Sequence, residues 1–157
     1  MTIIVYSSRT GSSERYARAL GERTGFQVFS VKEQYDENEP IVFIGWIKGP
    51  RLTGFDRVDH HKVIAVAAVA LDDRPSFGWQ KVKDTNEIKC PFYHLRGWID
   101  RKKLGILSKL FFCFLCAYYK LRGLDSHTGP LFDAMMNGGS FYDESALEPL
   151  VLLCRNH

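Results

Sequence analysis

The chain has 157 residues, of which 45% are hydrophobic and 13% aromatic, and its formal net charge is +3. This length and composition suit one domain with a sizeable apolar core. The net charge is too small to indicate nucleic-acid binding, so we expect no nucleic-acid partner. Basic residues nevertheless gather in one segment, at Arg96, Arg101, Lys102, Lys103, Lys109, Lys120 and Arg122.

Cysteine usage and the N-terminal stretch indicate the compartment. Four cysteines in a chain of this size do not form the framework of a small secreted disulfide domain. Cys113 and Cys116 have C-x-x-C spacing, but neither a second pair nor nearby histidines accompany them, so we predict no metal site. Residues 2–6 lack the basic start and the length of a signal peptide. We therefore expect a cytoplasmic protein with reduced thiols.

Short apolar runs alternate with helical patterns along the chain. Uninterrupted apolar runs rich in β-branched residues predict strands that are buried on both faces. The expected strands cover residues 2–6, 26–31, 41–46, 62–71 and 90–98. Strands that alternate with helices indicate a parallel sheet with helices on both faces, which is a doubly wound α/β fold. In such sheets, ligands bind at the carboxyl ends of the strands.

The first three helices are expected between these strands. The first follows the first strand, takes Ser12 or Ser13 as its N-cap and ends before Gly25. A brief helix is expected over residues 55–61 and a short one over residues 80–89.

The second half of the chain is predicted to hold two more helices. Residues 100–123 form one long apolar and basic helical pattern. Residues 124–142 are expected to be a loop, in which His127 is a weaker candidate to face a substrate. The last helix is predicted to be capped near Asp143, with residues 146–154 as its apolar body.

The turn between the first strand and the first helix is rich in small polar residues. At this position, free backbone N–H groups and the positive end of the helix dipole favour an anion. Gly11 allows the backbone to approach that anion closely. One serine is sufficient for an N-cap, so the number of hydroxyl groups favours a phosphate site. The hydroxyl side chains are those of Ser7, Ser8, Thr10, Ser12 and Ser13.

Absent motifs narrow the kind of phosphate. The chain contains no G-x-x-x-x-G-K-[ST] and no G-x-G-x-x-G in this turn, which disfavours nucleoside triphosphates and dinucleotides. The turn has no cysteine, as a cysteine phosphatase requires, and no acidic pair follows the first strand, as a phospho-acceptor domain requires. A neutral, hydroxyl-rich loop suits the terminal monophosphate of a flavin.

Residues 8–13, SRTGSS, resemble the [ST]-x-T-G-x-[ST] phosphate loop of flavodoxins. The resemblance implies a flavodoxin-like three-layer sandwich whose five parallel strands have the order 2-1-3-4-5. It also implies non-covalent binding of FMN. Ser13 stands where threonine is common, and Arg9 brings a charge to the variable position. The implied phosphate ligands are Ser8, Arg9, Thr10, Gly11, Ser12 and Ser13.

The second half of the chain resembles the flavodoxin-type protoporphyrinogen IX dehydrogenases of bacteria. The resemblance lies in residues 92–123 and in a basic, apolar helical insertion at about residues 99–125. It implies one flavodoxin-like domain over residues 1–157, a porphyrinogen as substrate and a quinone as oxidant. Residues 47–61 are shorter than in that pattern, so the helix of this region is expected to be stunted.

The same resemblance implies where the isoalloxazine ring lies. It is expected between the loops that follow the third and fourth strands, where Trp46 is the candidate for ring stacking. Phe77 and Trp79 are weaker candidates, and core packing is the better interpretation of Trp79. The implied ring-contacting residues are Trp46, Ile47, Lys48, Gly49, Leu71, Asp72 and Asp73.

Residues 104–121 leave two interpretations open. Their apolar run is far shorter than the roughly 20 residues needed to span a bilayer, and basic residues flank it. The segment is either an ordinary core helix or an interfacial helix that docks on a membrane or a partner. The second interpretation implies a peripheral position at the inner face of the membrane.

Three functions remain open from the sequence. We favour an FMN-dependent oxidoreductase that acts on a small molecule or a redox partner. The first alternative is a plain flavodoxin that carries electrons between proteins, although such carriers tend to be acidic and this chain has a pI near 8.7. The second alternative is a flavin-free binding module on the same fold.

Overall fold

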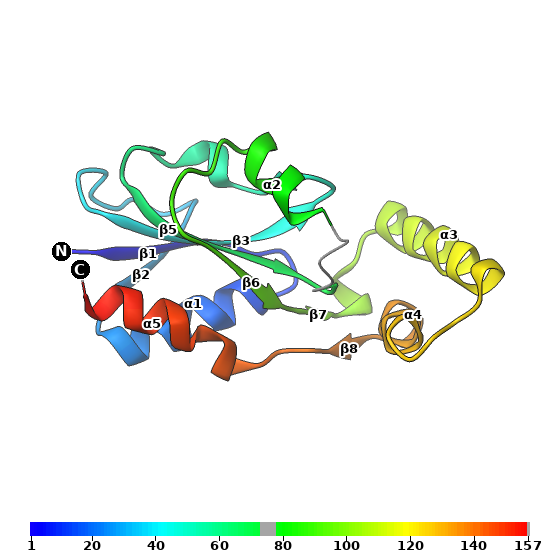
Figure 1. Ribbon diagram of the computed structural model, residues 1–157. Coiled ribbons are helices and arrows are strands. Elements are labelled where there is room, and N and C mark those ends of the chain that lie inside the picture. The colour runs from blue at the N-terminus through cyan, green and yellow to red at the C-terminus, as the bar shows by residue number, and fades with distance from the viewer. Residues whose placement is uncertain (73–77, 157) are drawn as a thin grey trace.

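A parallel sheet forms the centre of the computed structural model, which describes residues 1–72 and 78–156 (Figure 1). Its parallel strands are β1 (Ile3–Ser7), β2 (Gln27–Ser30), β3 (Ile41–Lys48), β5 (Val63–Ala70) and β6 (Phe92–Arg96). Their order is β2-β1-β3-β5-β6. The short strand β4 (Arg51–Leu52) pairs antiparallel with the end of β3 and lies off this path.

The predicted flavodoxin-like sandwich is confirmed by this sheet. Apart from β4, the strand order is the 2-1-3-4-5 of flavodoxin-like folds. The strand numbers differ from this order only because β4, which was not predicted, is counted as a strand. In the register, Ile3 of β1 lies between Gln27 of β2 and Ile41 of β3. The reversal of strand order between β1 and β3 marks the edge of the sheet where this fold class binds ligands.

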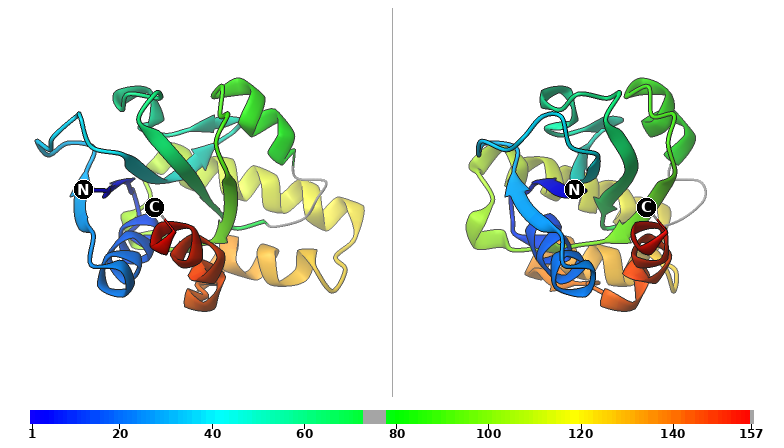
Figure 2. Two further views of the ribbon diagram at one scale, coloured as in Figure 1. Left: turned by 60° about the vertical axis from the view of Figure 1, so that its left-hand side comes forward. Right: turned by 90° about the vertical axis from the view of Figure 1, so that its left-hand side faces the viewer.

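Alternate residues of each strand enter two different cores, which explains the uninterrupted apolar runs. Ile4 and Val42 pack on one face against α1 (Ser12–Thr24) and α5 (Glu148–Arg155). Phe43 packs on the other face, where Phe55 and Trp79 close the second core. These two residues belong to the 3-10 turn η1 (Phe55–Arg57) and to α2 (Trp79–Thr85). Figure 2 shows α1 and α5 on one side of the sheet and α2 on the other.

Helix α1 begins differently from the prediction. The residue before it is Gly11, with φ at 101° and no side-chain capping bond, so the prediction of Ser12 or Ser13 as N-cap is wrong. The chain leaves β1 through a left-handed conformation that a serine adopts only with strain. Ser12 and Ser13 are therefore the first helical residues. Gly25 ends the helix as predicted, and its N–H donates to the Gly21 carbonyl at 2.8 Å.

The connections on either side of β5 are short. The helix expected over residues 55–61 is reduced to the 3-10 turn η1, and the hairpin of β3 and β4 precedes it. This 3-10 turn is the stunted helix that the shortness of residues 47–61 predicts. Helix α2 begins at Trp79, after Gly78, and ends at Thr85. The helix predicted over residues 80–89 is therefore four residues shorter at its end.

An arm leaves the sheet after β6 and returns before α5. It contains strand β7 (Trp98–Ile99), the 3-10 turn η3 (Arg101–Lys103), helix α3 (Ile106–Arg122), helix α4 (Thr128–Asn137) and strand β8 (Gly139–Ser140). β7 and β8 pair antiparallel at its base. Figure 1 shows α3 and α4 at the end of the molecule opposite the two termini.

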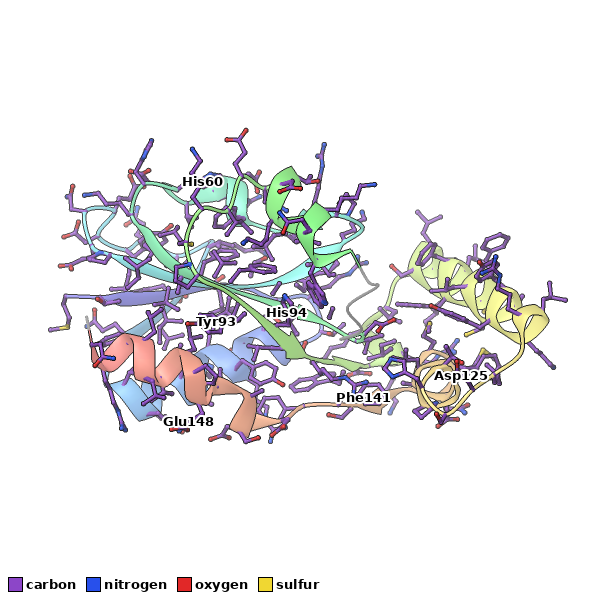
Figure 3. The ribbon with its side chains drawn as sticks, viewed as in Figure 1. His60, Tyr93, His94, Asp125, Phe141 and Glu148 are labelled. Carbon is purple, nitrogen blue, oxygen red and sulfur yellow. The ribbon has the colours of Figure 1, made fainter. Side chains whose placement is uncertain are left out.

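Helix α4 lies where a loop was expected. Gly129 and Pro130 are unfavourable inside a helix. Pro130, however, is in the first turn of α4, where the N–H that proline lacks has no partner within the helix. Asp125 accepts from the N–H groups of His127 and Thr128 at 2.9 and 2.7 Å, and so satisfies donors at the start of the helix (Figure 3). The predicted helix over residues 100–123 is shorter than expected, because it begins at Ile106.

The last helix agrees with its prediction. Asp143 accepts from the Ser145 N–H and caps the 3-10 turn η4 (Glu144–Leu147), which leads into α5. Across residues 1–72 and 78–156, every helix is too short or too polar to span a bilayer.

Tyr16 joins three segments that are distant in the sequence. Its hydroxyl donates to the Arg96 carbonyl at 2.6 Å and accepts from the Asp143 N–H at 3.0 Å. Burial raises the pKa of Tyr16 to about 12, so the hydroxyl keeps the proton that it donates. This side chain therefore holds the exit of β6 and the start of η4 against α1.

We predict that Tyr16→Phe lowers the free energy of unfolding by about 1–3 kcal/mol, because it removes both hydrogen bonds of the hydroxyl and the Asp143 N–H loses its acceptor. Urea denaturation measures this change. Tyr142→Phe is the matched control, since Tyr142 is only partly buried and its hydroxyl lies 3.3 Å from the carboxylate of exposed Glu144. We expect that variant to change stability by no more than about 0.5 kcal/mol. Equal effects of the two variants would contradict the role of Tyr16.

Candidate functional site

A cavity of about 980 Å³ lies at the carboxyl ends of the strands, between the sheet and the arm. Its volume is at the upper end of the range usual for small-molecule sites. Four segments from the sheet side line it, namely the β1–α1 turn, the end of β3, the end of β5, and Gly97 and Trp98 after β6. The sequence-predicted residues that line it are Arg9, Thr10, Ser12, Trp46, Ile47, Lys48, Gly49, Leu71 and Asp72.

The β1–α1 turn presents backbone donors at the edge of the cavity. The N–H groups of Ser12, Ser13 and Glu14 open helix α1 and have no acceptor within it. Ser8 shapes the turn, because its Oγ accepts from the Gly11 N–H at 3.0 Å. The positive end of the α1 dipole adds to these donors, so the turn favours an anion.

Three of the predicted phosphate ligands do not line the cavity. Ser8 and Gly11 act on the shape of the turn. Ser13 is fully buried, and its Oγ has no hydrogen-bond partner within residues 1–72 and 78–156. Thr10, Ser12 and Arg9 remain as the side chains of this turn that a ligand in the cavity can reach.

Trp98 holds the turn in place and was not predicted. Its indole N–H donates to the Thr10 carbonyl at 2.9 Å, and the Thr10 hydroxyl donates to the Trp98 carbonyl at 3.5 Å. Its ring lies 3.2 Å from the position that a Cβ of Gly11 would take. The available signal was its position at the end of the predicted last strand, at the ligand-binding edge of the sheet.

The end of β3 supplies an aromatic wall. Trp46 is half-buried beside the cavity, and the Arg9 guanidinium lies 5.8 Å from the centre of its ring. This distance is typical of a cation–π contact. Lys48 and Gly49 are exposed at the tip of the β3–β4 hairpin, where Gly49 has a φ of 59°. The charge of Arg9 therefore lies between the β1–α1 turn and the aromatic wall.

The end of β5 is held by partners from two other segments. Arg96 of β6 donates from Nε to the Leu71 carbonyl at 3.2 Å, and its guanidinium lies 4.1 Å from the centre of the Phe141 ring. Figure 3 shows Phe141 directly after β8, on the segment that returns from the arm. The buried carboxylate of Asp72 lies 3.4 Å from Nε2 of His127 in the arm. The predicted Asp73 lies outside the described residues, as does Phe77.

Trp79 has a structural role, as its sequence position suggested. It is buried in the core on the α2 side and does not line the cavity. Its ring stacks on that of His94 at 4.0 Å and 11°. Burial lowers the pKa of His94, so this ring favours its neutral form in the stack.

The arm covers the cavity with apolar side chains that sequence reasoning did not assign to the site. They project from the start of the arm, from α3 and from α4. Cys116, Leu131 and Met135 pack together in a separate small core that holds α3 against α4. The cavity is therefore polar at the β1–α1 turn and apolar under the arm. The apolar lining comprises Ile99, Leu104, Leu107, Phe111, Phe112, Leu115, Tyr119, Leu131 and Met135.

The arrangement suits a ligand that is anionic at one end and flat and apolar at the other. The β1–α1 turn has backbone amides, two reachable hydroxyl groups and a cation for the anionic end. Among the described residues, no three His, Cys, Asp or Glu side chains gather as a metal ion would need.

Comparison with models of protein families gives no match, and neither does comparison with curated proteins. Among solved structures, the chain is similar to one described as the structure of a flavodoxin from the domain Archaea. The identity is 15% and the TM-score is 0.41, over 65% of this chain and 87% of that chain. The flavodoxin-like fold follows from the strand order of the sheet itself.

Gly97 allows β6 to pass close to the β1–α1 turn. A Cβ at this position would lie 2.9 Å from Ser12 Oγ and 2.9 Å from Val69 Cγ1. We therefore predict that Gly97→Ala displaces Ser12 and lowers the free energy of unfolding by about 1–3 kcal/mol. Thermal unfolding measures the change.

Gly129→Ala is the control, because a Cβ there has no neighbour within 4 Å and the residue lies in a helix. We expect it to leave stability unchanged or to raise it by up to about 1 kcal/mol. If Gly97→Ala is as stable as the wild type, the close packing of β6 on the turn is not required.

Proposed function

We propose that the protein binds FMN non-covalently and acts as an oxidoreductase. The observation that carries the proposal is the cavity of about 980 Å³, in which a hydroxyl-rich helix N-terminus faces the ends of β3 and β5. These are the three segments that the resemblance to flavodoxins assigns to the phosphate and to the two sides of the flavin ring.

The side chains at the turn fit a phosphate monoester. Thr10 and Ser12 offer hydroxyl donors, and the amides at the start of α1 add backbone donors. Arg9 brings one positive charge to the same end of the cavity. The hydroxyl of buried Ser13, which has no hydrogen-bond partner in the described part of the chain, is a further polar group at the first turn of this helix.

The flat part of FMN fits the wider part of the cavity. Trp46 gives an aromatic surface for stacking, and Leu71 and Asp72 line the end of the neighbouring strand β5. When bound, FMN supplies the redox chemistry. The chain holds the ring in position and excludes water from it with the apolar side chains of the arm.

A bulky apolar substrate is the finer part of the proposal. The arm adds an apolar surface that a flavin alone does not need, because aromatic and leucine side chains of α3 extend the lining. This supports a porphyrinogen as substrate and a quinone as oxidant, as the resemblance to the protoporphyrinogen IX dehydrogenases implies. The short η1 connection has no role in this lining, since none of its residues reaches the cavity.

We predict that the double variant Thr10→Ala/Ser12→Ala binds FMN at least about tenfold more weakly, because a hydrogen bond to a charged group contributes roughly 1.5–3 kcal/mol. Titration of FMN, followed by the quenching of flavin fluorescence, gives the dissociation constant.

The matched control is Thr85→Ala/Ser126→Ala, in which both residues are exposed and outside the cavity. It is expected to bind FMN like the wild type. If the wild-type protein shows no flavin absorption after incubation with FMN, the proposed function is wrong and the fold serves as a flavin-free module.

We also predict that the FMN-loaded protein converts protoporphyrinogen IX to the porphyrin when a quinone is present. The rise in porphyrin fluorescence measures the reaction, and protein without FMN is the control. Electron exchange with a ferredoxin reductase without porphyrinogen turnover would instead identify a plain electron carrier.

A further inference from the structure

Helix α3 carries an apolar stripe that faces solvent. Leu110, Phe114 and Leu121 are 61%, 74% and 89% exposed. The exposed positions 107, 111, 114, 118 and 121 repeat with a spacing of four and three residues, so they lie on one side of the helix. We name this stripe the α3 ridge. Its members are Leu107, Leu110, Phe111, Phe114, Tyr118 and Leu121.

The α3 ridge is separate from the face that packs on the protein. Phe112, Leu115, Cys116 and Tyr119 face the small core that α3 shares with α4. A helix on the surface of a globular protein needs one apolar face, and α3 has two. A contiguous exposed patch of leucine and aromatic side chains marks an interaction surface.

The charged residues of the segment that carries the ridge are all basic. Residues 101–124 contain six basic residues and no acidic residue. Arg101 is bound within the arm, where its Nη1 donates to the Met135 carbonyl at 2.9 Å. Lys102 and Lys103 are exposed just before α3, and the Arg122 guanidinium lies 4.9 Å from the centre of the Tyr118 ring at the other end of the ridge.

These charges distinguish between two occupants of the ridge. A second copy of the chain would bring the same basic segment against the first, with no acidic group in residues 101–124 to compensate. An anionic lipid surface supplies the opposite charge, and each lysine or arginine near it contributes roughly 1 kcal/mol, which is about a fivefold gain in affinity. Exposed Leu and Phe with flanking lysines are the composition of helices that lie in a membrane interface.

We propose that the α3 ridge docks flat on an anionic phospholipid membrane. Figure 1 shows α3 at one end of the molecule, opposite the sheet edge that carries the termini. Leu107 and Phe111 belong to the ridge and also line the cavity. The rim of the cavity therefore lies at the membrane contact, and an apolar ligand reaches the cavity from the lipid phase.

Sedimentation with lipid vesicles tests the docking with the full chain. We expect at least about tenfold tighter binding to vesicles that contain phosphatidylglycerol than to vesicles of phosphatidylcholine alone, and a loss of this preference at high salt. The vesicles contain no flavin or quinone, so the result does not depend on the proposed function. Equal binding to both vesicles, or to neither, would overturn the proposal.

Two exposed leucines give a matched pair of variants. Leu121→Glu alters the ridge outside the cavity, whereas Leu152→Glu alters α5, where the side chain is 53% exposed. We expect Leu121→Glu to weaken vesicle binding at least about tenfold, because it removes apolar area from the contact and adds repulsion. Leu152→Glu is expected to bind like the wild type.

A second pair tests the charges. Lys102→Gln/Lys103→Gln is expected to weaken binding to anionic vesicles about tenfold or more, whereas Lys81→Gln/Lys89→Gln on the α2 side is not. Thermal unfolding of each variant verifies that it is folded.

Light scattering of the protein without lipid tests whether a second copy of the chain covers the ridge instead. A monomer that binds anionic vesicles through the ridge supports the proposal. A dimer that Leu121→Glu dissociates would overturn it, because a second copy then covers the ridge.

Discussion

The packing of Gly97 and Trp98 on the β1–α1 turn is the contact on which the site depends. The Gly97 N–H donates to the Ala70 carbonyl at 2.8 Å, and the Gly97 carbonyl accepts from the Phe141 N–H at 3.0 Å. The same short segment thus contacts the end of β5 and the strand that returns from the arm. Trp98 adds the bond to the Thr10 carbonyl at 2.9 Å. Because these contacts converge, the turn, the sheet and the arm keep one relative arrangement.

This arrangement gives the cavity two chemically different ends. Arg9 and Lys48 are the basic residues that line it and Asp72 is the acidic one, within the described part of the chain. Asp72 lies beside His127, so its charge is turned toward the arm. The helix N-terminus and Arg9 are on the side of the β1–α1 turn, which suits an anion, whereas the arm contributes apolar groups. A ligand that is anionic at one end and apolar at the other is therefore favoured in one orientation.

The arm also explains why α3 is so exposed. Its contacts with the protein come from α4 and the small core around Cys116 and Leu131, and most of its surface faces outward. Helix α3 therefore borders the cavity on one side and exposes leucine and phenylalanine side chains to the solvent on the other. Leu107 and Phe111 contribute to both surfaces.

The sequence alone determined the sheet and the position of the hydroxyl-rich turn after the first strand. Apolar runs rich in β-branched residues identify strands that are buried on both faces, and the turn after β1 is recognisable from its hydroxyl groups and Gly11. The start of α1 and the presence of α4 were missed. The spacing of apolar residues does not show that Gly11 is in a left-handed conformation or that Pro130 is in the first turn of a helix.

Only the tertiary structure decided what covers the site. Trp98 and Thr10 are 88 positions apart in the chain, and they meet because β6 ends beside the β1–α1 turn. The apolar face of α3 was visible in the sequence, but a pattern of apolar residues does not say which partner buries it. Local periodicity reports that a residue is apolar on one side of a helix, whereas the identity of its neighbour depends on the path of the whole chain.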